Sequence, residues 1–107
     1  MSKNVLLVIP TLNEFGNIQK IYKKIKKYNQ NIKLLFIDDN SSDGSQKVII
    51  DLKKKNKNVQ YYFRPKKLGI GSAHKYGIRL AKRKKFQYIC TMDCDGTHDP
   101  KHINKML

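Results

Sequence analysis

Hydrophobic residues follow two alternating patterns along the chain. Short continuous apolar runs are typical of strands that are buried on both faces of a parallel sheet. Such runs cover residues 5–9, 34–37 and 88–92, and residues 59–63 form a further strand pattern that is β-branched and aromatic. Between them, apolar residues recur at helical spacing, with lysines on the opposite face. These helical stretches contain Ile18, Val48 and Ala73, so the pattern predicts the order βαβαβαβ.

This order predicts an open α/β fold. Strands that alternate with helices form a Rossmann-like parallel sheet, and right-handed crossovers place the loops after all strands along one edge. We expect the strand order 3-2-1-4, which makes the first and fourth strands neighbours where such sheets bind ligands. Pro10 is expected to end the first strand, and Asp99-Pro100 to begin a further helix. A chain of 107 residues is expected to form one domain at most.

Acidic residues are few and concentrated in three predicted loops. The chain has 8 Asp+Glu against 23 Lys+Arg, which gives a net charge of +15. Seven acids follow the first, second and fourth predicted strands: Glu14, Asp38, Asp39, Asp43, Asp93, Asp95 and Asp99. A solvated surface does not require this clustering, so the edge that carries these loops is the candidate site. The lysine runs are interpreted as solvated helix faces.

Asp93 and Asp95 directly follow the fourth predicted strand and precede Gly96. Hard cations bind oxygen ligands, and Mg²⁺ is commonly held by one or two carboxylates together with substrate phosphates. The pair therefore suits a divalent cation. The alternative is that both residues only form a turn, because aspartate favours turns.

The basic charge leaves several partner classes open. It suits nucleic acid, an anionic membrane or a phosphorylated substrate. Aromatic residues are not interleaved with the basic runs as a stacking platform requires, so we expect no nucleic acid partner. The longest apolar run, Val5 to Ile9, is too short to span a membrane, and no signal peptide is recognisable. These features predict a cytoplasmic protein with reduced cysteines.

Four motifs along the whole chain together resemble the family 2 glycosyltransferases, which have a GT-A fold. PTLNE at 10–14 resembles the family's first-strand motif, IDDNSSDG at 37–44 its second, and MDCDGTH at 92–98 its metal motif. RPKKLGIGSA at 64–73 is similar to the loop of dolichyl-phosphate and other polyprenyl-phosphate mannosyltransferases. Leu12 stands where a tyrosine is frequent, and Cys94 replaces a common alanine.

The resemblance implies that residues 1–107 form a nucleotide-sugar-binding domain of the GT-A type. The acceptor-binding half is expected to be missing, so the chain is expected to be truncated at Leu107. The resemblance also implies a set of residues that bind the nucleotide-sugar donor: Pro10, Leu12, Glu14, Ile37, Asp39, Asp93, Cys94 and Asp95.

The resemblance gives several of these residues a specific role. Asp93 and Asp95 would hold Mg²⁺ or Mn²⁺ at the diphosphate, where a cation neutralises charge that grows on the leaving group. Asp39 would accept a hydrogen bond from the base. Structural alternatives are an Asx-turn or helix cap for Asp39 and a helix cap for Glu14. Asp38 and Asp43 are interpreted as structural loop and cap residues. Three basic residues of the third loop either hold phosphates or are solvated: Arg64, Lys66 and Lys67.

No catalytic base is assigned. A sugar hydroxyl needs a general base, whereas a phosphate monoester ionises a second time near pH ~6 and attacks without one. We therefore expect transfer of a sugar, mannose or glucose, from a nucleotide-diphosphate sugar to a polyprenyl or dolichyl phosphate, with a peripheral contact to the cytoplasmic membrane face. The alternatives are a saccharide hydroxyl acceptor, a catalytically incomplete nucleotide-binding fragment, and a basic nucleic-acid-binding protein.

Overall fold

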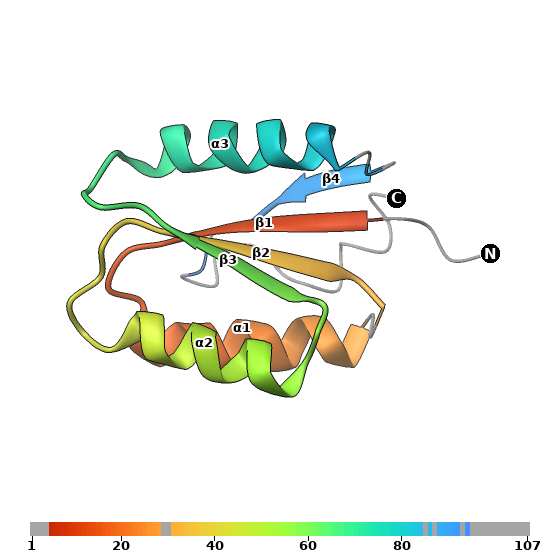
Figure 1. Ribbon diagram of the computed structural model, residues 1–107. Helices are drawn as coiled ribbons and strands as arrows, with labels where there is room; N and C mark the ends of the chain where they lie inside the picture. Colours follow the sequence, from red (N-terminus) through yellow and green to blue (C-terminus); the bar gives the residue numbers. More distant parts are fainter. Residues whose placement is uncertain (1–4, 29–30, 85, 87, 93, 95–107) are drawn as a thin grey trace.

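A computed structural model describes residues 5–28, 31–84, 86, 88–92 and 94 (Figure 1). Helices and strands alternate as predicted. In chain order they are β1 (Val5–Thr11), α1 (Phe15–Tyr28), β2 (Lys33–Asp38), α2 (Ser45–Lys55), β3 (Val59–Phe63), α3 (Ile70–Arg83) and β4 (Tyr88–Thr91). The helix expected at Asp99-Pro100 lies outside the described residues.

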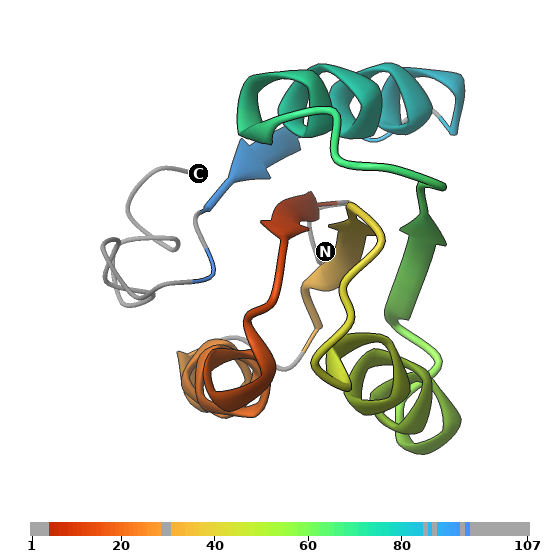
Figure 2. The same cartoon turned by 90° about the vertical axis from the view of Figure 1, so that its left-hand side faces the viewer.

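The four strands form one parallel sheet in the order β3-β2-β1-β4, which confirms the predicted topology. Leu7 of β1 lies between Leu34 of β2 and Cys90 of β4. Because the strands are parallel, the loops that follow them lie along the same edge of the sheet. Figure 2 looks onto this edge.

Helices cover both faces of the sheet, with α1 and α2 on one face and α3 on the other (Figures 1 and 2). Alternation along β1 sends Leu7 and Ile9 into the core beneath α1 and α2, and Leu6 and Val8 into the core beneath α3. Both faces of the strand are therefore apolar, as the continuous hydrophobic run predicted. None of the described helices is long and apolar enough to cross a membrane.

Gly77 allows α3 to pack closely against β1. It lies on the buried face of the helix, and a Cβ atom at this position would overlap Cγ1 of Val8 and lie 2.9 Å from its Cγ2. Real Cβ atoms essentially never approach so closely. The absence of a side chain at Gly77 therefore sets the distance between α3 and the sheet.

The prediction that Pro10 ends the first strand is wrong, because β1 continues to Thr11. Backbone groups of alternate residues point to the same side of a strand. The carbonyl of Val8 accepts from the Met92 amide on the β4 side, whereas the carbonyl of Thr11 accepts from the Asp39 amide after β2. Pro10 shares the orientation of Val8, so its missing N–H removes no bond to β2.

Candidate functional site

A pocket of about 240 Å³ lies at the carboxyl edge of the sheet. The loops after all four strands contribute to its lining: Pro10, Thr11, Leu12, Glu14, Asp39, Lys67, Gly69, Ile70 and Cys94. Among them are five of the residues that the sequence placed around the donor, namely Pro10, Leu12, Glu14, Asp39 and Cys94. Residues far apart along the chain thus meet in one cavity.

Three residues of the predicted set are not placed in this pocket. Ile37 is fully buried, and it packs with Val8 and Ala73 in the core beneath α3. We therefore treat Ile37 as a core residue and no longer assign it to the nucleoside pocket. Asp93 and Asp95 lie outside the described residues, although Cys94 between them is buried and lines the cavity.

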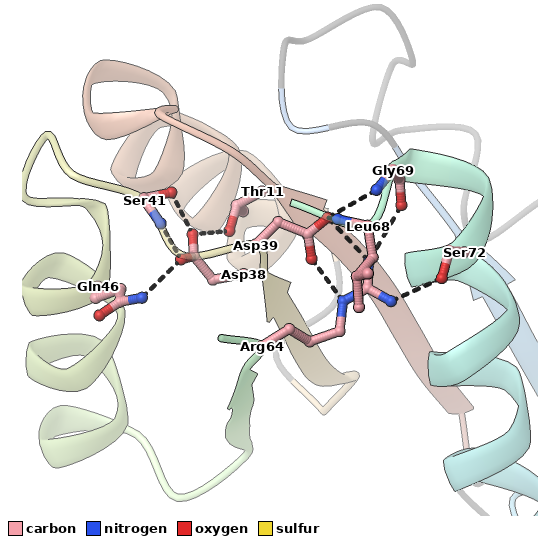
Figure 3. A network of polar contacts seen from close by, with 9 residues as sticks. All are labelled: Thr11, Asp38, Asp39, Ser41, Gln46, Arg64, Leu68, Gly69 and Ser72. Carbon is pink, nitrogen blue, oxygen red and sulfur yellow. Dashed lines mark hydrogen bonds and ion pairs between the residues drawn. The ribbon is translucent and has the colours of Figure 1, made fainter. Parts of the chain in front are cut away.

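Asp39 is the most strongly bound carboxylate in the pocket wall (Figure 3). Arg64 donates from Nε to Oδ1 at 2.5 Å and from Nη2 to Oδ2 at 2.9 Å. The backbone amides of Leu68 and Gly69 each donate to Oδ2 at 3.0 Å. The ion pair is buried, with side chains only 4% and 6% exposed. This arrangement is neither an Asx-turn nor a helix cap.

The hydrogen bonds of Asp39 are divided unequally between its two oxygens. Within the part of the chain that the structure describes, Oδ2 accepts from three donors, whereas Oδ1 accepts from Arg64 Nε alone. A carboxylate offers about four acceptor positions over its two oxygens. Oδ1 is therefore the atom that can take one further N–H donor, such as one from a nucleobase.

Arg64 holds the third loop in place. Besides Asp39, its guanidinium donates from Nη1 to Ser72 Oγ at 2.8 Å and from Nη2 to the Gly69 carbonyl at 3.1 Å (Figure 3). Arg64 is only 4% exposed, so this geometry does not leave it available as a phosphate ligand. The sequence contained one signal for the pairing of Arg64 with a carboxylate. Arginine is rare in this lysine-rich chain, and its planar guanidinium group can donate to both oxygens of a carboxylate at once.

The electrostatics keep Asp39 ionised. Burial acts to raise the pKa of this carboxyl, but the hydrogen bonds and charge of Arg64, with the amides of Leu68 and Gly69, outweigh it. The net effect lowers the pKa of Asp39 below its ordinary value of 3.8. At neutral pH the pocket wall therefore presents a carboxylate.

Asp38 is structural, as the sequence predicted. It is fully buried and accepts from Thr11 Oγ1 at 2.5 Å, Ser41 Oγ at 2.6 Å, the Ser41 amide at 2.8 Å and Gln46 Nε2 at 2.9 Å (Figure 3). These bonds tie the end of β1 to the loop between β2 and α2. The buried Asp38 side chain thus links the two pocket-lining segments that contain Thr11 and Asp39.

Asp43 serves both helices on the same face of the sheet. Its Oδ2 accepts from the Phe15 amide at the start of α1, at 3.1 Å, and its Oδ1 accepts from the Ser45 amide at the start of α2, at 3.0 Å. Burial acts to raise the pKa of Asp43, but hydrogen bonds from Ser45 and Phe15 lower it overall. The structural interpretation of Asp43 is confirmed.

Glu14 combines a local structural role with a position in the pocket lining. Its backbone carbonyl accepts from the amides of Asn17 and Ile18, at 2.8 and 3.1 Å, as expected for the residue that precedes α1. Its side chain accepts from Asn17 Nδ2 at 2.8 Å through Oε2. The backbone of Glu14 therefore caps α1, which was the structural alternative for this residue. The residue also lines the pocket.

Comparison with known proteins identifies several relatives. Polyprenol monophosphomannose synthase of Mycolicibacterium smegmatis is 28% identical over 107 residues, which cover 99% of this chain and 40% of that protein. Undecaprenyl-phosphate mannosyltransferase of Micrococcus luteus is 27% identical, over 96% of this chain and 42% of that protein. Dolichol-phosphate mannosyltransferase of Saccharomyces cerevisiae is 30% identical, over 100% of this chain and 41% of that protein.

A solved structure shares the fold. The mannosyltransferase PcManGT from Pyrobaculum calidifontis, in complex with GDP-Man and Mn²⁺, superposes with a TM-score of 0.76 at 17% sequence identity. The match covers 89% of this chain and 28% of that one. This likeness confirms the expected Rossmann-like open sheet of the GT-A type.

The chain spans about two fifths of the length of the curated relatives that it matches. The model of the family described as glycosyl transferase family 2 matches residues 6–107. Apart from Val5, the first residue of β1, that match covers every element of the described fold and the four loops that meet at the pocket. The chain belongs to glycosyl transferase family 2.

Proposed function

We propose that residues 1–107 form the donor-binding part of a metal-dependent glycosyltransferase that transfers a sugar from a nucleotide-diphosphate sugar to a polyprenyl phosphate. The observation that carries the proposal is the pocket at the carboxyl edge, where Glu14, Asp39 and Cys94 meet from three different loops. Parallel α/β sheets bind ligands at this edge. The GDP-Man bound by the P. calidifontis enzyme supports mannose as the sugar and guanosine diphosphate as its carrier.

We assign the base-binding role to Asp39. Its carboxylate is ionised, and its Oδ1 retains an acceptor position. Arg64 fixes the orientation of this carboxylate, so the acceptor is preorganised before the ligand binds. A single N–H of the base is the donor that suits this acceptor atom.

We assign Asp93 and Asp95 as ligands of Mg²⁺ or Mn²⁺. Two carboxylates are a hard donor set that fits either cation. The position of Cys94 in the pocket lining supports a metal loop beside the donor, and the Mn²⁺ of the P. calidifontis enzyme supports manganese. When bound, the cation would supply charge neutralisation for the leaving diphosphate.

The acceptor and the location are proposed together. The names of the curated relatives support a polyprenyl phosphate acceptor, which arrives already ionised and needs no catalytic base. Such an acceptor resides in a membrane. We therefore place the protein at the cytoplasmic membrane face as a peripheral contact, with no nucleic acid partner.

Calorimetry tests the donor site. GDP-mannose is titrated into the chain with Mn²⁺, with Mg²⁺ and with excess chelator, and we expect binding that is at least tenfold tighter with metal. Asp95→Asn should weaken binding about as much as the chelator does. Asp51→Asn is the matched control, because this carboxylate lies on α2 and outside the pocket lining. Equal affinity with and without metal would refute the proposal.

Transfer requires a separate test, because the chain spans only part of the length of its relatives. The chain is incubated with GDP-[¹⁴C]mannose and one of three acceptors: a polyprenyl phosphate, the corresponding free alcohol or a saccharide. Label in the phosphate alone supports the proposed acceptor. Tight donor binding without transfer identifies the chain as a nucleotide-binding fragment, and label in a saccharide hydroxyl would contradict the acceptor assignment.

A further inference from the structure

A long segment of the chain contains basic residues but no acidic ones. Between Asp51 and Asp93 there is no Asp or Glu, whereas residues 52–92 contain 13 Lys and Arg. This segment supplies β3, α3 and β4. Several cations of α3 and the residue after it are exposed: Lys75, Arg79, Lys82, Arg83 and Lys84. The face of the sheet that α3 covers therefore combines strong positive charge with no acidic residue from this segment.

A groove of about 520 Å³ lies on this same face, at the end of α3 that is remote from the donor pocket. Its apolar and aromatic lining comes from β1, β2, β3, the end of α3 and the segment between α3 and β4: Leu6, Leu35, Tyr61, Tyr62, Leu80 and Phe86. Three exposed lysines also line it, Lys33, Lys57 and Lys84, and no acidic residue is among its described lining. Its volume falls within the usual range for sites of small molecules.

The groove is separate from the proposed donor site. Lys33 is the first residue of β2, and Lys57 precedes β3, so these lysines mark the amino ends of the strands. The donor pocket lies at the carboxyl ends, and the two cavities share no lining residue. A ligand in the groove would therefore bind independently of the nucleotide.

We infer that the groove binds an anionic phospholipid of a membrane surface. The three lysines match the negative charge of a lipid phosphate, and the apolar lining matches the first part of an acyl chain. The ammonium group of Lys33 lies 5.5 Å from the centre of the Phe86 ring, so a cation already occupies one approach to that aromatic side chain. Two tyrosines of the lining already pack against other rings, Tyr61 on Phe63 and Tyr62 on Tyr76. Fewer aromatic faces are therefore left for the base stacking that binding of single-stranded nucleic acid uses.

Lipid binding at this groove would orient the domain. The end of α3 lines the groove, so the exposed cations of this helix would turn toward the membrane together with it. Each lysine close to an anionic surface strengthens binding roughly fivefold. The three groove lysines together would then account for about 100-fold in vesicle affinity.

Vesicle co-sedimentation of the whole chain tests this inference without nucleotide. We expect binding to vesicles that contain phosphatidylglycerol and little binding to pure phosphatidylcholine. Replacing Lys33, Lys57 and Lys84 with Gln should lower the affinity about 100-fold. The matched control replaces Lys23, Lys24 and Lys27 with Gln, because these exposed lysines lie on α1, across the sheet, and the change in net charge is the same. The control variant should lose less than tenfold.

A second measurement examines the apolar lining in the unaltered protein. Short-chain phosphatidylglycerol should displace the chain from vesicles at concentrations at least tenfold below those of glycerol 1-phosphate, which lacks the acyl chains. Equal losses in the two triple variants would show diffuse attraction and overturn the inference. Equal competition by glycerol 1-phosphate, or tighter binding to an RNA oligonucleotide than to the anionic vesicles, would also overturn it. None of these outcomes depends on whether the chain binds GDP-mannose.

Discussion

Arg64 and Asp39 form a buried two-point ion pair, with 2.5 Å between Nε and Oδ1 and 2.9 Å between Nη2 and Oδ2. The pair joins the end of β2 to the loop that leads into α3. It also builds one wall of the donor pocket, because Asp39 and Gly69 both line that cavity. Stability and ligand binding are therefore coupled at this pair.

Removal of Arg64 should destabilise the protein strongly. Arg64→Ala leaves the Asp39 carboxylate buried without its charge partner, and such losses typically cost about 3–5 kcal/mol. Arg64→Lys should also destabilise, because an ammonium group cannot reproduce the two-point geometry. Urea denaturation measures the free energy of unfolding, and Arg79→Ala on the exposed face of α3 is the control, with a change of less than about 0.5 kcal/mol. Similar values for the Arg64 and Arg79 variants would contradict the prediction.

The pH dependence of stability should follow the lowered pKa of Asp39. A carboxyl whose pKa is lower in the folded state stabilises the fold above its unfolded pKa, and this contribution is lost as the pH falls through the folded pKa. We therefore expect a free energy of unfolding that declines once the pH falls below the ordinary value of 3.8. Carboxyl carbon NMR should give Asp39 a titration midpoint below that value. A midpoint at or above 3.8 would show that burial dominates instead.

Two glycines of α3 should respond oppositely to alanine. Gly77→Ala forces a methyl group against Val8 and should cost about 1–3 kcal/mol. Apart from its chain neighbours and the backbone of its own helix, no described heavy atom lies within 4 Å of a Cβ built on Gly71, so Gly71→Ala should stabilise the helix by up to about 1 kcal/mol. Denaturation midpoints of the two variants test the contrast. Stabilisation by Gly77→Ala would mean that α3 can shift away from the sheet at little cost.

Asp43→Ala should weaken two helix starts at once. The side chain bonds the Phe15 amide of α1 and the Ser45 amide of α2, and a lost cap usually costs about 0.5–2 kcal/mol. Asp43→Asn should retain part of this contribution, because an amide oxygen still accepts a hydrogen bond. Hydrogen exchange should show faster exchange at the first turns of both helices. Faster exchange in α2 alone would refute the double role.

The elements and their topology could be predicted because they depend on local patterns. Apolar runs located the strands, and the handedness of crossovers placed the carboxyl ends together. Glu14 and Asp39 were expected to share a crevice for this reason, and they line one pocket. Pro10 was misjudged because the direction of its missing N–H depends on which neighbouring strand it faces.

Side-chain partners across the fold could not be read from the sequence. Arg64 was interpreted as a phosphate ligand or a solvated residue, because its pairing with Asp39 joins two loops that meet only after the sheet forms. Ile37 was assigned to the nucleoside pocket. It lies in a continuous apolar run, where both faces are hydrophobic and the pattern does not show which way a given side chain points.

The central position of β1 has a consequence for the order of folding. β1 pairs with β2 soon after both are synthesised, but its other edge waits for β4, so that Val5 finally lies beside Tyr88. Closing so long a loop has an entropic cost, which is offset only once the contacts between the two strands have formed. Pairing over long sequence separations is therefore slow. Docking of β4 should therefore be a late kinetic step. β4, which leads into Asp93 and Asp95, would then join a sheet in which the Asp39–Arg64 pair of the pocket has already formed.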